Sequence, residues 1–296
     1  MERASWELEE GELLVEGRTV LKSIGGGSRY EVFLVWDDDL FSIAVAKALR
    51  PDQASEERAM RELAEEAELL ERVAHPVIVR GFDAVLEGPR PHLVIEHLEG
   101  PSLRRLLRRH GPLELLQLLP VALHVAGALA YLERHGLVHL DVKPDNIVMG
   151  VPPRLIDLSI ARTFEHAARS KGPLGTDAYM APEQCGPDGF GAMGPASDVW
   201  GLGATVHHCI SGHRPFPRPE GARDSADPEV RFPQLHIEPE PLDRPLPDGL
   251  GELIGEMLNK ELTQRPSAAD VADRLEPFVA ELPHKLSLSR RGRVLG

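Results

Sequence analysis

Apolar and polar residues alternate through the first part of the chain and follow a helical period through most of the remainder. The alternation covers residues 15–47 and again residues 90–97, and a period of two is typical of strands with one buried face. Residues 55–73 instead begin with acidic side chains and end before His75-Pro76, which predicts a helix. The pattern therefore predicts a small sheet lobe that precedes a larger helical lobe.

Three segments of the second lobe can be assigned from their composition. Residues 115–132 are strongly apolar, but Gln117, Pro120 and His124 interrupt them, so a buried core helix is favoured over a membrane span. Residues 199–210 predict a second buried helix. Prolines recur every few residues between positions 215 and 249, which favours an extended wrap over the surface rather than a regular helix.

Charged residues gather at positions 139–146, His-Leu-Asp-Val-Lys-Pro-Asp-Asn, and Asp157 follows eleven residues after the last of them. Transfer of a phosphoryl group from ATP needs a carboxylate to orient the attacking hydroxyl, oxygen ligands for a metal, and a cation near the moving charge. These residue types are supplied by Asp141, Lys143, Asn146 and Asp157. Because Asp and Asn are also ordinary turn residues, the interpretation depends on the motifs around them.

Three upstream features fit the same chemistry. Residues 24–32 place glycines between two predicted strands, where backbone amides can approach phosphates; a glycine-rich hairpin turn is the plain alternative. Lys47 is the only charge in the apolar run 43–47, although a solvated edge lysine would give the same pattern. The helix predicted at 55–73 carries several glutamates, one of which could face the sheet and pair with Lys47.

The order of these motifs resembles the eukaryotic-like, Hanks-type serine/threonine protein kinase family over about residues 20–281. Further motifs of that family are present: a hinge strand at 93–96, Gly175-Thr176, Ala181-Pro182-Glu183, Asp198-Val199-Trp200 and Arg265-Pro266. The resemblance implies an α+β, two-lobed fold with an antiparallel sheet in the first lobe. It divides the chain into an N-terminal extension (1–18), an N-lobe (19–97), a C-lobe (98–282) and a basic tail expected to be disordered (283–296). The glycine-rich segment and the alanine- and proline-rich loops resemble bacterial, in particular actinobacterial, members.

The resemblance also implies the substrates and the roles of the site residues. ATP would bind between the lobes with Mg²⁺, or Mn²⁺ in its place, and its γ-phosphoryl group would pass to a serine or threonine of a protein. The implied catalytic residues are Asp141, Lys143, Lys47, Glu66 and Thr176. The implied nucleotide contacts are Ile24, Gly25, Gly26, Gly27, Val32, Val45, Lys47, Ile95, Glu96, Leu98, Asn146 and Asp157, and Asn146 and Asp157 would also hold the metal.

Four residues depart from the family pattern. Leu140 stands where most regulated members have an arginine that clamps a phosphate of the activation segment, so we expect activity that does not require phosphorylation there. Ser159 and Tyr30 replace glycines, and Val45 replaces an alanine. These changes keep a pseudokinase, which binds nucleotide or a partner without transfer, as an alternative. A small-molecule kinase would share the catalytic motif but lacks the motifs at 175–183, and is disfavoured.

Composition narrows the partners and the compartment. A chain of 296 residues with 42% hydrophobic content can bury the core of one two-lobed domain. The formal charge of -14 opposes general binding to nucleic acid or to an anionic membrane. Two cysteines and no signal peptide predict a cytoplasmic protein. Protein substrates are the expected partners, and a regulatory protein or a second copy of the chain are further candidates.

Overall fold

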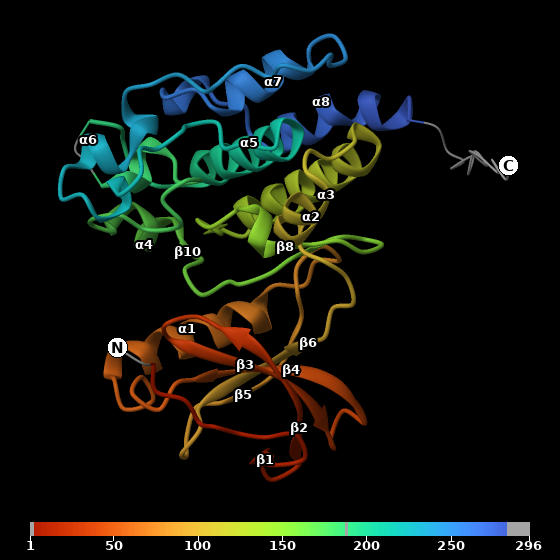
Figure 1. Cartoon of the computed structure of the whole chain (residues 1–296), viewed down its shortest axis with the longest axis vertical. Helices are drawn as coiled ribbons and strands as arrows, with labels where there is room; N and C mark the ends of the chain where they lie inside the picture. Colours follow the sequence, from red (N-terminus) through yellow and green to blue (C-terminus); the bar gives the residue numbers. More distant parts are fainter. Residues whose placement is uncertain (1–2, 187–188, 283–296) are drawn as a thin grey trace, which may run out of the picture.

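The computed structural model describes residues 3–186 and 189–282, which form a sheet lobe and a helical lobe (Figure 1). The sheet has six antiparallel strands in the order β1-β2-β3-β4-β6-β5. Their bounds are Leu13–Val15 (β1), Arg18–Gly26 (β2), Tyr30–Asp37 (β3), Ser42–Leu49 (β4), Gly81–Val85 (β5) and His92–Glu96 (β6). The expectation of an α+β, two-lobed fold is confirmed, and the basic tail expected at 283–296 lies outside the described residues.

The outer face of the sheet is covered by the N-terminal segment. Phe33 and Val35 belong to a buried cluster on this face, and Leu8 packs against that cluster. Trp6 donates its indole N–H to the carbonyl of Leu49 at 2.7 Å. Parts of the segment expected to precede the N-lobe therefore contact the sheet, and Leu13–Val15 forms its first strand.

The inner face of the sheet is covered by helix α1 (Glu57–Arg72), close to the helix predicted at 55–73 (Figure 1). Ala59, Leu63 and Leu70 are buried along one side of this helix, as the spacing of an amphipathic helix requires. Glu66 is also buried, with 3% of its surface exposed. A buried carboxylate needs a partner, and this one faces β4.

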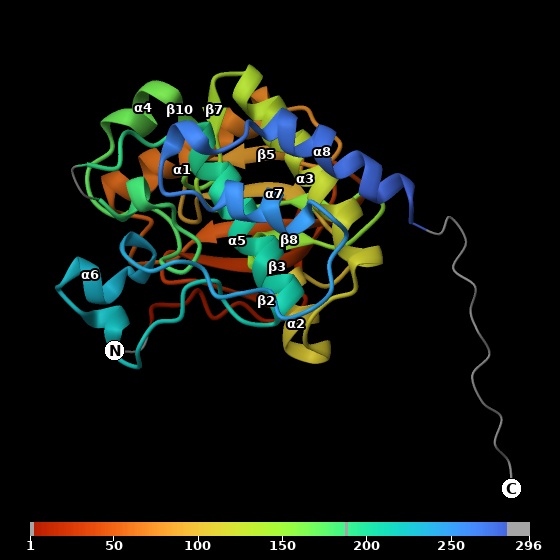
Figure 2. The ribbon, with the colours of Figure 1, turned by 90° about the horizontal axis from the view of Figure 1, so that it is seen from above.

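The second lobe is built mainly of helices. They are α2 (Leu103–His110), α3 (Leu115–Arg134), α4 (Phe164–Arg169), α5 (Pro195–Ser211), α6 (Pro228–Arg231), α7 (Leu250–Met257) and α8 (Ala268–Ala280). Helix α3 packs against α5 and α8, and both views show α8 lying along it (Figures 1 and 2). The buried helices predicted at 115–132 and 199–210 correspond to α3 and α5.

Helix α3 also bears on the question of a membrane span. Within the described part of the chain it is the helix whose length and composition would suffice to cross a membrane. Its side chains Leu118, Val125 and Leu129 are buried in the main hydrophobic cluster of the protein. The helix therefore packs as a core helix of this lobe.

Two short strand pairs hold the loops that carry the predicted site. Strand β7 (Leu137–Val138) pairs with β10 (Arg162–Thr163), and β8 (Ile147–Val148) pairs with β9 (Arg154–Leu155). A 3₁₀ turn over Pro144–Asn146 leads into β8. Asp141 and Asn146 thus lie between β7 and β8, while Asp157 follows β9, which brings all three to the side of the lobe that faces the sheet.

The proline-rich segment 215–249 wraps over the surface, as predicted, apart from the four-residue α6 and two 3₁₀ turns. Asp177 holds it to the rest of the lobe. This carboxylate accepts hydrogen bonds from Arg218 at 3.0 Å and from Arg231 at 3.1 Å, and Gln234 donates to the carbonyl of residue 177 at 2.7 Å. The stretch around Asp177 is therefore one anchor of the wrap, beside others such as the contacts of His207 with the Glu240 carbonyl and of Arg244 with the Leu113 carbonyl.

Candidate active site

Lys47 lies at the centre of a buried charge cluster between the two lobes. Its ammonium Nζ donates to both carboxylate oxygens of Glu66, each at 2.9 Å, and to Oδ1 of Asp157 at 2.8 Å. Strand β4, helix α1 and the loop after β9 each supply one of the three residues. The pairing of Lys47 with Glu66, rather than with another glutamate of α1, is the one expected from the sequence.

The electrostatics of this cluster keep Lys47 and Asp157 charged, while burial raises the pKa of Glu66 above its ordinary value. Burial alone would lower the pKa of Lys47, but the carboxylates of Glu66 and Asp157 hold it above its ordinary value. Burial alone would raise the pKa of Asp157, and the Lys47 ammonium instead holds it well below its ordinary range. Asp157 is therefore a carboxylate at neutral pH, which is the form that a divalent cation needs.

Asp141 is held in a second polar cluster below the first. Its Oδ1 accepts a hydrogen bond from the Thr176 hydroxyl at 2.8 Å, and its Oδ2 accepts one from Lys143. Lys143 also donates to Thr176 Oγ1 at 2.7 Å, so Thr176 bridges the two charges. Asn146 donates its amide nitrogen to Asp141 Oδ2 at 3.0 Å. The carboxylate is thus oriented by three neighbours and only partly buried.

The loop that carries Asp141 is fixed from beneath by Asp198. The two carboxylate oxygens of Asp198 accept hydrogen bonds from the backbone N–H groups of His139 and Leu140, both at 2.7 Å. Burial raises the pKa of Asp198 to about 6. At the base of the lobe, Arg265 and Glu183 form a fully buried ion pair at 2.7 Å. Both contacts support the structure of the lobe: neither Asp198 nor the Arg265–Glu183 pair lines the cavity between the lobes.

A cavity of about 330 Å³ extends from the Lys47 cluster to the strand that joins the lobes. It is lined by nine of the twelve expected nucleotide contacts: Ile24, Val32, Val45, Lys47, Ile95, Glu96, Leu98, Asn146 and Asp157. Its walls are apolar apart from these few charged and amide groups, as is typical of sites that take an aromatic ring at one end and a polar group at the other.

The three glycines among the expected contacts do not line this cavity. Gly25 and Gly26 end β2 with φ of +126° and +141°, values that favour glycine. A Cβ atom on Gly26 would lie 2.3 Å from the carbonyl oxygen of Tyr30, and Gly27 donates its N–H to that oxygen at 3.0 Å. The glycines therefore make a tight turn that leads into β3 at the edge of the site.

Sequence reasoning missed five residues that line the cavity: Leu70, Val79, His97, Val148 and Ile156. Two of them had a usable signal. Val148 follows Asn146 by two residues and Ile156 precedes Asp157, so apolar side chains flank both expected metal ligands. Leu70 and Val79 reach the cavity only through the packing of α1 against the sheet, which no local pattern describes.

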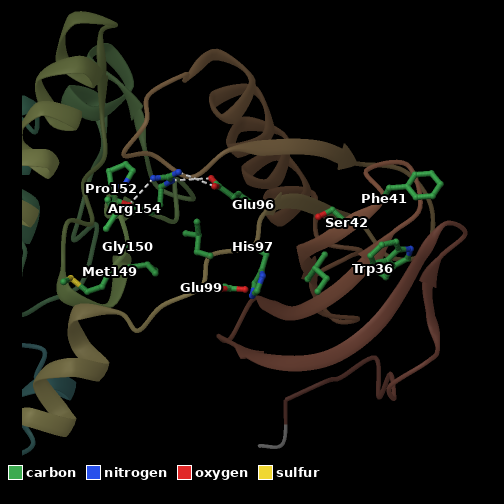
Figure 3. Close-up of a pocket in the computed structure, with 14 residues that line it drawn as sticks. Trp36, Phe41, Ser42, Glu96, His97, Glu99, Met149, Gly150, Pro152 and Arg154 are labelled. Carbon is green, nitrogen blue, oxygen red and sulfur yellow. Dashed lines mark hydrogen bonds and ion pairs between the residues drawn. The ribbon is translucent and has the colours of Figure 1, made fainter.

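A larger cavity of about 610 Å³ lies on the outer side of the joining strand, between the β3–β4 turn and the β8–β9 turn. Figure 3 shows the Glu96 side chain turned into it toward Arg154, which it pairs with at 3.4 Å. Lys47, Asp141 and Asp157 do not line it.

Comparison with known proteins identifies the family. The profile of the family described as "Protein kinase domain" matches residues 18–275. The chain belongs to this family. Serine/threonine-protein kinase pkn2 of Myxococcus xanthus is 33% identical over 283 residues, which are 89% of this chain and 32% of the relative.

Two further kinases are similar over most of this chain. Serine/threonine-protein kinase PkaA of Streptomyces coelicolor is 34% identical over 79% of the chain and 42% of its own length. Serine/threonine-protein kinase PknK of Mycobacterium tuberculosis is 33% identical over 89% of the chain and 24% of its own length. The chain thus spans between about a quarter and two fifths of the length of these relatives. All three are bacterial, as the glycine-rich segment and the alanine- and proline-rich loops indicated.

The protein kinase family uses a divalent metal with ATP, and the residues of the site fit one. Within residues 3–186 and 189–282, no three His, Cys, Asp or Glu side chains form a cluster that could hold an ion alone. Mg²⁺ typically takes one or two protein ligands and completes its shell with phosphates and water. Because Asn146 uses its amide nitrogen on Asp141, its oxygen is left for a cation beside the Asp157 carboxylate.

Leu140, the largest departure from the kinase pattern, is buried in an apolar cluster with Val138, Ala167 and Met193. Ala167 belongs to α4, within the segment that regulated kinases phosphorylate. The backbone of Leu140 has a φ of +64°, a value that costs energy for a side chain with Cβ and persists where the surroundings fix it. Here the hydrogen bond from the Leu140 N–H to Asp198 fixes it.

Proposed function

We propose that this kinase domain transfers the γ-phosphoryl group of ATP to serine or threonine hydroxyls of proteins. The observation that carries the proposal is the orientation of the Asp141 carboxylate by Lys143, Thr176 and Asn146, opposite a buried Lys47–Glu66–Asp157 cluster. The names of the similar proteins, all serine/threonine-protein kinases, support the same activity.

Asp141 would accept the hydrogen bond of the substrate hydroxyl and take its proton as the bond to phosphorus forms. Lys143 lies beside this carboxylate and would balance charge on the moving phosphoryl group. Lys47 would hold the α- and β-phosphates, with Glu66 keeping the ammonium in line. Asn146 and Asp157 would hold Mg²⁺, or Mn²⁺ in its place, which neutralises phosphate charge when bound.

A protein substrate is favoured over a small molecule. Thr176 lies in a segment that continues through the buried 3₁₀ turn Pro182–Cys185. Glu183 of this turn accepts a hydrogen bond from Ser197 of α5, and Asp177 accepts one from Arg218 of the proline-rich wrap. These contacts fix the segment that carries Thr176, which hydrogen-bonds Asp141. A kinase of small molecules would not need a fixed segment of this kind beside Asp141.

The decisive experiment compares Asp141→Asn with the wild type for transfer from labelled ATP to itself and to a generic basic protein. Because Asp141 orients the hydroxyl, we expect a loss of about a hundred- to ten-thousandfold in transfer, with nucleotide affinity retained. Asp145→Asn is the matched control, since Asp145 is exposed in the same turn. Wild-type protein that binds nucleotide but transfers nothing would instead support a pseudokinase.

The remaining partners follow from the same proposal. A regulatory protein or a second copy of the chain could bind through either lobe, and the cytoplasm is the compartment in which ATP and protein substrates meet. We propose these partners and this compartment on the basis of the kinase activity. They leave the roles of the residues named above unchanged.

A further inference from the structure

Tyr30 occupies the place where the kinase family has the third glycine of its loop, and its side chain points to the inner face of the sheet. It pairs with Leu49 in the β3–β4 register, next to the Val32–Lys47 pair. Because side chains alternate along a strand, Tyr30 and Val32 share the face that meets α1. Only 8% of Tyr30 is exposed.

Arg29, next to Tyr30, ties this end of the loop to helix α1. Tyr30, Ala59 and Leu63 all belong to the main hydrophobic cluster of the protein. Arg29 forms an ion pair with Glu62, one residue before Leu63. Since Glu66 lies one turn further along the same helix, the position of Tyr30 is coupled to the helix that holds Lys47.

The ring itself lies against the ammonium group of Lys47. The distance from Lys47 Nζ to the ring centroid is 4.5 Å, within the range of a cation–π contact. The ammonium already donates to Glu66 and Asp157, so the ring closes a further side of it. A flexible lysine in this position loses freedom to turn away from the cavity.

The hydroxyl group of Tyr30 is the unusual part. It is buried and, among the residues that the structure describes, it is the side-chain polar group recorded without a hydrogen-bond partner. Burial raises the pKa of Tyr30 to about 12, so the hydroxyl keeps its proton and can donate. A buried donor without a partner costs free energy. The charges around it are those of Lys47, Glu66, Arg29 and Asp157.

We propose that the Tyr30 hydroxyl donates a hydrogen bond to a phosphate oxygen of the bound nucleotide, while its ring positions Lys47. The inference rests on the proposed function, because it needs a nucleotide whose phosphates lie at Lys47. Phosphate oxygens only accept hydrogen bonds, and this hydroxyl is a buried donor without a partner on a ring that contacts the Lys47 ammonium. Tyr30 does not line the cavity as the structure has it, so the contact requires the hydroxyl to turn toward the phosphates when the nucleotide binds. At the position of the third glycine, this chain would therefore contact the phosphate through a side chain, whereas a glycine there has only backbone groups to donate.

Tyr30→Phe tests this, because it removes the hydroxyl and keeps the ring on Lys47. Calorimetric titration with Mg²⁺ and a non-hydrolysable ATP analogue should show about a tenfold weaker affinity in the variant, as for a lost hydrogen bond to a charged group. Affinity for adenosine, which has no phosphate, should stay within about twofold of wild type. Tyr131→Phe is the matched control, since Tyr131 hydrogen-bonds Ala74 of the backbone away from the cavity.

A spectroscopic measurement separates contact from indirect effects. The chain has three tyrosines, so in a tyrosine-labelled sample the Tyr30 ring signal should shift with the ATP analogue and not with adenosine. Equal or tighter binding of the analogue by Tyr30→Phe overturns the inference, and points to a water molecule as the partner of the hydroxyl. Wild-type protein that fails to bind the analogue overturns the proposed function as well, so the two failures are distinguishable.

Discussion

At the scale of single residues, Leu140 has an apolar environment at the position where most regulated kinases have an arginine. Its side chain fills the apolar cluster around Ala167 and Met193, so Leu140→Ala should lower the free energy of unfolding by about 2–5 kcal/mol, the usual cost of such a cavity. Leu13→Ala is the control, since Leu13 is 55% exposed and should cost about 0.5 kcal/mol or less. Urea denaturation measures both, and equal small losses would contradict the role given to Leu140.

The sequence predicted the charged residues of the site better than their apolar surroundings. Glu66 could be chosen among the glutamates of α1 because its place relative to His75 matched a family pattern, and the ion pair with Lys47 is present. Tyr30 could not be oriented, although its spacing of two from Val32 placed both on one face of a strand. Which face is buried depends on α1, a contact far away in the sequence.

At the scale of elements, the proline-rich wrap depends on Asp177, whose carboxylate is shared by Arg218 and Arg231. Asp177→Asn removes the charge from both contacts. We expect amide hydrogen exchange in residues 218–236 to rise by about tenfold, the factor that matches about 1.4 kcal/mol of local stability. Asp243→Asn, an exposed position of the same wrap, should leave exchange unchanged; a uniform rise through the whole lobe would argue for a global effect instead.

Elements were predictable where their own residues decide them. The apolar run of α3 and the prolines after residue 215 fix a buried helix and an irregular wrap without help from other parts of the chain. The packing of the N-terminal segment could not be predicted in this way. Its contacts, Trp6 with Leu49 and Ser5 with Glu31, join residues far apart in sequence and have no periodic pattern.

At the scale of the whole molecule, a buried histidine should make stability depend on pH. Burial, with Arg104 and Arg214 nearby, lowers the pKa of His208 from 6.5 to about 4, and its Nδ1 accepts a hydrogen bond from the Tyr179 hydroxyl at 2.7 Å. Between these two values the unfolded chain binds a proton that the folded one does not. Stability is therefore full above about pH 6.5 and falls as the pH drops toward 4, by about 3 kcal/mol at most.

His208→Asn isolates this contribution, because asparagine can accept the Tyr179 hydrogen bond without titrating. The variant should lose less stability than the wild type between pH 6.5 and 4, measured by denaturant unfolding at each pH. A difference curve is needed because the raised pKa of Asp198 acts in the opposite sense over part of this range. His124→Asn, an exposed change on α3, should follow the wild type; parallel curves for all three proteins would refute the assignment.

Regulation of the whole kinase by phosphorylation of the segment around α4 can also be tested. Because Leu140 docks the segment around α4 by apolar contact, phosphorylation of Thr163 or Ser170 should not be required for transfer. The Ser170 hydroxyl accepts a hydrogen bond from Arg162 at 3.1 Å, and Thr163 caps α4 by accepting from the His166 N–H. Ser170→Ala and Thr163→Asn prevent phosphorylation, and the asparagine retains a helix cap.

Phosphatase-treated wild type and both variants should transfer phosphate to a protein substrate at rates within about twofold of one another, which is below 0.5 kcal/mol in barrier height. The phosphatase-treated sample matters because it removes phosphate without changing any side chain. A loss of tenfold or more in that sample and in both variants would mean that a phosphate orders the segment after all. Arg162, which already reaches Ser170, would then be the cation that holds it, and the apolar cluster around Leu140 would be secondary.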